Sequence, residues 1–167
     1  METLEKYRAA AAKATRAEFV EEFAGLYLLK RPTKGGEVQQ PSTKIGFATT
    51  LAQIGIDPLA SEWRIVPVRK RPDNPFPERL SIGRATNCDL VLRLPFVSKV
   101  QAHFVQQPDG SFVLRNKEPS NPTFHNHRKL EPNASRPLTV GDMVGFGPLV
   151  FEFVDAARLY DVLKRET

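Results

Sequence analysis

The sequence predicts a mainly β protein: an antiparallel β-sandwich with an α-helical extension before it and a short helix after it. From Arg64 onward, short runs rich in Val, Leu, Ile and Phe are separated by Pro, Gly, Asn or Asp, at the spacing of a β-sandwich. The preceding residues instead show helical spacing. We expect a helical extension and linker over 1–62, the sandwich over 63–154 and a C-terminal helix over 155–167.

Residues 1–30 are predicted to form a helix because apolar residues recur at helical intervals and no Pro interrupts them. The repeating positions are Leu4, Tyr7, Ala11, Ala14, Phe19, Phe23, Leu26 and Tyr27. This apolar face either packs on the sandwich or mediates self-association or partner docking. A polar linker is expected over 31–44, and a short helix is expected from Thr49 or Thr50 to Ile54.

The strand region contains nine short runs, which cover residues 64–70, 78–84, 88–92, 102–107, 111–116, 123–130, 136–141, 142–147 and 149–154. The sequence Pro108–Ser111 predicts a hairpin turn with Gly110 at positive φ. Val140–Asp142 predicts a second tight turn. Asp155 is the expected N-cap of the closing helix.

Composition narrows the possible functions. No apolar run approaches the ~20 residues that span a bilayer, and the first residues do not resemble a secretory signal. The single cysteine, Cys88, excludes an internal disulfide and fits a cytoplasmic protein, in which we interpret it as a small core residue. No catalytic motif, cofactor motif or metal-ligand set is recognisable, and His125 and His127 are interpreted as a surface pair. We therefore expect a protein that is not an enzyme.

The charge favours an acidic partner, because the net charge is +5 and the sequence pI is about 9.5. Between residues 64 and 154, Lys and Arg outnumber Asp and Glu by 13 to 8. Sequence-independent nucleic-acid binding is therefore one alternative, although the aromatic residues do not suggest a base-stacking surface.

Five motifs occur in order along the strand region: Ile-Gly-Arg at 82–84, Asn-x-Asp-Leu-Val-Leu at 87–92, Val-Ser-Lys at 97–99, Asn-Pro-Thr-Phe-His-Asn at 121–126 and Leu-Thr-Val-Gly-Asp-Met-Val-Gly-Phe-Gly at 138–147. In order and spacing these motifs resemble the forkhead-associated (FHA) family. The resemblance implies an FHA/SMAD-like antiparallel sandwich that binds phosphothreonine peptides through loops at one end.

The resemblance also implies roles for individual residues. Arg84, Ser98, Lys99 and Asn121 match the family positions that contact the phosphopeptide. A guanidinium group provides a rigid fork of donors for phosphate oxygens, which is why an arginine suits this position. The positions that support the binding loops are Gly83, Gln101, Thr123 and Asn126.

Three residues depart from the family pattern. Gln101 replaces a histidine that holds the binding loops together, although glutamine can also donate and accept hydrogen bonds. Pro122 replaces a glycine, so its loop cannot follow the family geometry in full. His127 replaces the glycine after the second asparagine and disfavours a simple type I′ turn.

The sequence thus predicts a phosphothreonine-dependent protein-recognition module, in Ser/Thr-kinase signalling or in complex assembly. The expected partner is a phosphothreonine-containing protein, for example a Ser/Thr kinase or its substrate, rather than a membrane or a nucleic acid. An alternative is a degenerate FHA scaffold that binds unphosphorylated partners, which Gln101 and Pro122 motivate.

Overall fold

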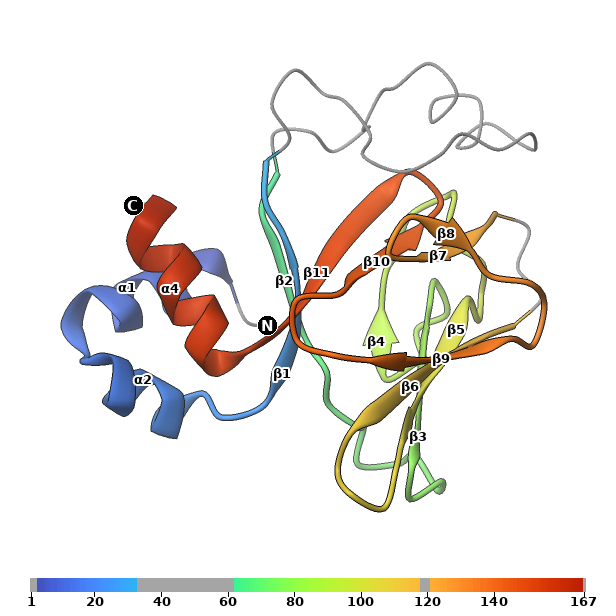
Figure 1. The fold of residues 1–167 in the computed structure, drawn as a ribbon, viewed down its shortest axis with the longest axis horizontal. Helices are drawn as coiled ribbons and strands as arrows, with labels where there is room; N and C mark the ends of the chain where they lie inside the picture. Colours follow the sequence, from blue (N-terminus) through green and yellow to red (C-terminus); the bar gives the residue numbers. More distant parts are fainter. Residues whose placement is uncertain (1–2, 33–61, 118–120, 167) are drawn as a thin grey trace.

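Among the residues that the computed structural model describes, two β-sheets stack face to face, and three helices form a further layer beside one of them (Figure 1). The structure describes residues 3–32, 62–117 and 121–166. The short helix expected to end at Ile54 lies outside the described residues, as does most of the expected linker over 31–44.

The first sheet has six strands, in the order β2 (Arg64–Pro67), β1 (Leu26–Lys30), β11 (Leu149–Asp155), β10 (Met143–Phe146), β7 (Thr123–His125) and β8 (Arg128–Lys129). The second has five, in the order β4 (Leu90–Val91), β3 (Arg79–Gly83), β5 (Ala102–Gln106), β6 (Phe112–Asn116) and β9 (Ser135–Leu138). The pairings are antiparallel except that of β3 with β4, which is parallel. The predicted β-sandwich is confirmed.

The core between the sheets is formed by every second residue of the strands, as the two-residue period of a strand requires. On β3, for example, Leu80 and Ile82 are buried in this core, whereas Ser81 between them lies on the outer face. The rings of Phe104 from β5 and Phe153 from β11 stack with centroids 6.5 Å apart, which joins the two sheets.

The N-terminal stretch differs from the single helix that its apolar spacing predicts. It forms α1 (Leu4–Lys13) and α2 (Arg16–Glu22), and the chain then enters β1. The break has a local cause, because Thr15 and Glu18 form a capping box that starts a new helix: the Glu18 N–H donates to Thr15 Oγ1 at 3.2 Å, and the Thr15 N–H donates to Glu18 Oε1 at 2.8 Å.

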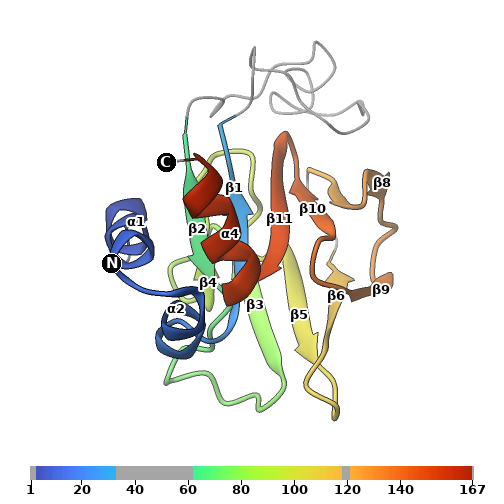
Figure 2. The same cartoon turned by 60° about the vertical axis from the view of Figure 1, so that its left-hand side comes forward.

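Residues 26–30 form a strand because they complete a sheet. β1 pairs with β11 on one side and β2 on the other, so the predicted extension over 1–62 supplies a strand to the sandwich as well as helices. Leu28 faces the core between the sheets, while Tyr27 and Leu29 face the helices. The apolar face of the N-terminal stretch is therefore buried within the chain, against β1, β11 and α4 (Ala156–Glu166) (Figure 2).

The turns follow the expected chemistry. Gly110 and Gly141 take positive φ values of 90° and 102°, which are readily available to glycine. The Arg158 N–H donates to Asp155 Oδ1 at 2.9 Å, which confirms Asp155 as the cap of α4. No described helix has the length and apolar character needed to cross a membrane.

Candidate functional site

Three loops that carry the predicted binding residues meet at one end of the sandwich. Arg84 follows β3, Ser98 and Lys99 lie between β4 and β5, and Asn121 precedes β7. Backbone hydrogen bonds join the first two loops, from the Arg84 N–H to the Ser98 carbonyl at 2.8 Å and from the Ala85 N–H to the Lys99 carbonyl at 3.2 Å. The Asn121 amide donates to the Phe96 carbonyl at 2.9 Å and attaches the third loop to the second.

Gly83 permits the closest of these approaches. A Cβ atom at this position would lie 2.2 Å from the Lys99 carbonyl oxygen and 2.9 Å from that of Ser98. Both distances are shorter than van der Waals contact allows, so a side chain would force the two loops apart. Glycine is therefore required here by the packing of backbone on backbone.

The Arg84 side chain is exposed and held at its base. Its Nε donates to the Val97 carbonyl at 3.0 Å, and the guanidinium forms no other hydrogen bond or ion pair with a described residue. The terminal nitrogens of the fork remain available to a ligand at the end of the sandwich. The simplest structural role for Arg84 would be an ion pair with Asp89 or Glu78. Neither ion pair forms among the described residues.

Gln101 ties the second and third loops together although it departs from the family pattern. Its side chain is fully buried. Oε1 accepts the backbone N–H of Ser98 at 3.0 Å, and Nε2 donates to the Asn121 carbonyl and to Thr123 Oγ1, both at 2.9 Å. The glutamine amide supplies one acceptor and two donors, and all three are used. Gln101 thus provides a buried bridge between the loops that carry Ser98 and Asn121.

Ser98 and Lys99 have their backbones fixed while their side chains reach the surface. The Ser98 N–H and carbonyl are both engaged, by Gln101 and Arg84 respectively. The Ser98 side chain is half-buried, and that of Lys99 is exposed. A hydroxyl and an ammonium group therefore accompany Arg84 at the same end of the fold.

The β7–β8 turn corrects the expectation drawn from His127. Asn126 and His127 take positive φ values of 48° and 69°, the pair of conformations that a type I′ turn requires. Asn and His tolerate this region better than most residues. The turn is also clamped to β10, because Asn126 Oδ1 accepts the Met143 N–H and the Asn126 N–H donates to the Met143 carbonyl, both at 2.8 Å. Asn126 therefore holds this turn against β10.

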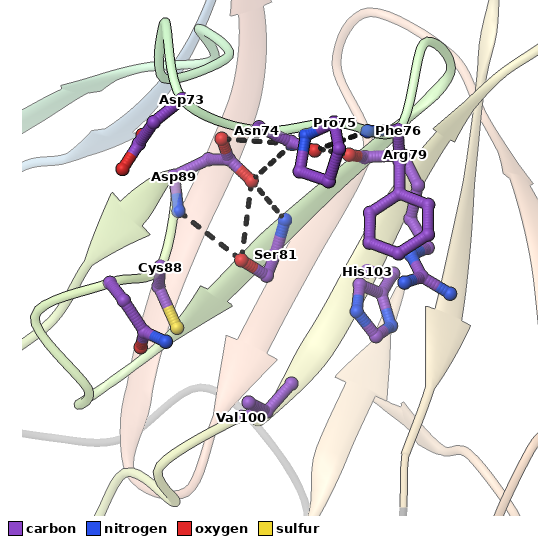
Figure 3. Close-up of a pocket in the computed structure, with 11 residues that line it drawn as sticks. Asp73, Asn74, Pro75, Phe76, Arg79, Ser81, Cys88, Asp89, Val100 and His103 are labelled. Atoms are coloured by element: carbon purple, nitrogen blue, oxygen red, sulfur yellow. Dashed lines mark hydrogen bonds between the residues drawn. The ribbon is translucent and has the colours of Figure 1, made fainter.

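Asp89 organises a neighbouring segment in a way that the sequence did not suggest. Its carboxylate accepts the backbone N–H groups of Arg71 at 2.7 Å and Ser81 at 2.8 Å, and the Asn74 amide at 2.9 Å. Burial alone would raise the pKa of Asp89, but these hydrogen bonds outweigh it and lower the pKa. The Asp89 clamp holds the segment before β3 against the outer face of the second sheet (Figure 3).

Cys88, His125 and His127 are the residues for which the sequence raised other roles, and the structure shows their surroundings. Burial raises the pKa of the Cys88 thiol, and the residue is 1% exposed, so it is buried as expected and stays protonated at neutral pH. His125 Nε2 lies 2.9 Å from Asp142 Oδ2, and His127 belongs to the adjacent turn. Within the described residues, no three His, Cys, Asp or Glu side chains gather closely enough to hold a metal ion.

Comparison with known families gives one match, to the family model described as FHA domain, over residues 80–147. This range contains every predicted binding and supporting residue. The chain therefore carries an FHA domain within its sandwich. A comparison with curated proteins gives no match.

The chain is also similar to solved FHA structures. The FHA-2 domain of a Mycobacterium tuberculosis ABC transporter is 30% identical, with 54% of this chain and 79% of that chain covered and a TM-score of 0.41. An FHA domain from Chlamydia trachomatis is 18% identical, covers 78% of this chain and 98% of its own, and has a TM-score of 0.47. The MEK1 FHA domain, solved with a phosphothreonine peptide of HOP1, is 21% identical, with 55% of this chain and 88% of that chain covered and a TM-score of 0.43.

Proposed function

We propose that this chain recognises a phosphothreonine-containing protein through the end of the sandwich that carries Arg84. In this role Arg84, Ser98 and Lys99 bind the phosphate, and Asn121 holds the backbone of the bound peptide. Gly83, Gln101, Thr123 and Asn126 keep the loops in place. The partner is a protein of Ser/Thr-kinase signalling or of a phosphorylation-dependent complex.

One observation carries the proposal most: the buried Gln101 side chain joins the loops of Ser98 and Asn121, while the base of the Arg84 side chain is held on Val97. A phosphate group has three strongly accepting oxygens and close to two negative charges at neutral pH. A guanidinium fork, a hydroxyl and an ammonium group can satisfy such a group from one side. Because the loops are joined before the ligand arrives, less ordering is needed on binding.

The decisive experiment compares phosphorylated and unphosphorylated versions of one threonine peptide library on wild-type protein and on Arg84→Ala. Loss of one charge-assisted contact of about 1.5–3 kcal/mol weakens binding about 10- to 150-fold. The matched control is Arg136→Ala on β9, which removes the same charge from an exposed position on the far edge of the second sheet. Arg136→Ala should change affinity less than threefold.

The alternatives predict different results. A degenerate scaffold would bind peptides equally well with and without phosphate, and Arg84→Ala would leave that binding unchanged. A nucleic-acid-binding protein would retain DNA or RNA at low salt and lose it steeply as salt rises. Either result, in the absence of phosphate-dependent peptide binding, would overturn the proposal.

A further inference from the structure

A cavity of about 330 Å³, with both polar and apolar lining residues, lies on the outer face of the second sheet (Figure 3). It is bounded by residues 73–76, by strands β3 and β5 and by residues 87–89. We call it the outer groove. Its floor consists of β3 and β5 side chains that alternate with core residues, among them Ser81 and His103.

His103 is a nearly buried imidazole that lacks a hydrogen-bond partner among the described residues. Its side chain is only 9% exposed, and it lines the groove. Burial, followed by the positive charges of Arg79, Lys117 and Arg115, lowers its pKa to about 4. The ring is therefore neutral at pH 7, with one N–H to donate and one nitrogen to accept. Neither ring nitrogen is used by a described residue, so both are open to a ligand that enters the groove.

Arg79 supplies the charge of the groove. Its guanidinium stacks over the Phe76 ring, 3.8 Å from the centroid, and forms no ion pair with a described residue. Of the two carboxylates of the groove, Asp73 pairs with Arg71 at 3.2 Å, whereas Asp89 keeps its negative charge because its hydrogen-bond donors are neutral. At the His103 ring the positive charges of Arg79, Lys117 and Arg115 outweigh that of Asp89, so this part of the groove suits an anion.

Two apolar side chains border the groove. Phe76 is 48% exposed and Val100 is 37% exposed, and both are among the most exposed large apolar side chains of the described residues. Val100 directly follows Lys99, and the Cys88 thiol donates to the Lys99 carbonyl at 3.3 Å. The outer groove is therefore continuous with the loops of the proposed phosphate site.

We propose that the outer groove binds an acidic side chain, next to an apolar residue, of the same protein partner whose phosphothreonine occupies the Arg84 site. This inference rests on the proposed function for the identity of the partner. A carboxylate would pair with Arg79 and accept the His103 N–H, while the apolar neighbour covers Phe76 or Val100. Strand β3 spans ~13 Å from Arg79 to Gly83 at about 3.3 Å per residue. An extended partner segment therefore places the acidic residue about four residues from the phosphothreonine.

The test is a phosphothreonine peptide library with eight randomised positions on each side, bound to wild-type protein, Arg79→Gln and Arg136→Gln. Wild type should enrich Asp or Glu about four residues from the phosphothreonine on one side. Arg79→Gln should lose this preference, with about tenfold weaker binding of an enriched peptide, and should keep phosphate dependence. Arg136→Gln should behave as wild type. Phosphate-dependent binding without any acidic preference, or with a preference that Arg79→Gln leaves unchanged, overturns this inference and leaves the proposed function standing.

A second measurement does not depend on phosphate binding. The His103 ring is followed by NMR while an acetylated, amidated peptide of alternating Glu and Leu is added. A bound carboxylate should raise the pKa of His103 from about 4 and shift its ring signals, and Arg79→Gln should abolish both effects. Unchanged ring signals at millimolar peptide overturn the inference. A response to inorganic phosphate with none to the peptide also overturns it.

Discussion

The buried Gln101 bridge can be tested by Gln101→Met, which nearly preserves the shape of the side chain and removes its hydrogen bonds. Three bonds of 2.9–3.0 Å are lost, and the Ser98 N–H, the Asn121 carbonyl and the buried Thr123 hydroxyl each lose a partner. At about 1 kcal/mol for each net hydrogen bond, the free energy of unfolding should fall by about 3 kcal/mol. For a chain of this size, that corresponds to a Tm lower by about 6–12 °C.

Urea unfolding measures this loss, with the fluorescence of Trp63, the only tryptophan, as the probe. The matched control is Gln106→Met, because Gln106 is exposed and its amide makes one contact of 3.4 Å, to the Gly110 carbonyl. It should stay within about 0.5 kcal/mol of wild type. A Gln101→Met variant as stable as the control would refute the bridging role.

Two further predictions concern packing and protonation. Gly83→Ala places a methyl group 2.2 Å from the Lys99 carbonyl oxygen and should destabilise the fold by about 3 kcal/mol or more. The variant should also lose phosphopeptide affinity in the peptide-library assay. Unchanged affinity and stability would contradict the role of glycine in the close approach of the two loops. The pKa of His103 is about 4 in the folded chain and near 6.5 in the unfolded chain, so between these pH values the unfolded chain binds more protons than the folded chain. The contribution of His103 to the free energy of unfolding is therefore complete above pH 6.5 and declines as the pH falls toward 4. If the imidazole were fully buried, the free energy of unfolding would fall by about 3 kcal/mol over this pH range, and access of water to the groove reduces the fall to about 1–2 kcal/mol. Urea midpoints at pH 7, 5.5 and 4.5 should show this decline, and His103→Gln should flatten it; an equally steep decline in the variant would assign the effect to other groups.

The strands from Arg64 onward could be predicted because their signals are local. Apolar runs and the residues that separate them lie within a few positions of one another, and the turn at Gly110 and the cap at Asp155 depend only on adjacent residues. The same holds for the positions of Arg84, Ser98 and Asn121 at strand ends. Alternation along β5 likewise places His103 on the face opposite Ala102.

Residues 26–30 could not be predicted as a strand because the partners that decide their conformation are distant. The apolar sequence of this segment suits a helix or a strand, and its pairing with residues 64–67 and 152–155 makes it a strand. The His127 conformation has a similar origin, since the turn is held by hydrogen bonds between Asn126 and Met143 on another strand. In both cases a non-local contact overrides the local preference.

The sequence by itself determined that the chain from Arg64 onward forms a β-sandwich, and which residues stand in the loops between its strands. Only the tertiary structure decided how those loops are joined, through the bridge from Gln101 to Ser98, Asn121 and Thr123. It alone also placed Arg79 and Phe76 beside His103 in the outer groove. The physical reason is the same in both places: a hydrogen bond or a ring contact depends on distances of a few ångströms between residues far apart in the chain, which no local pattern encodes.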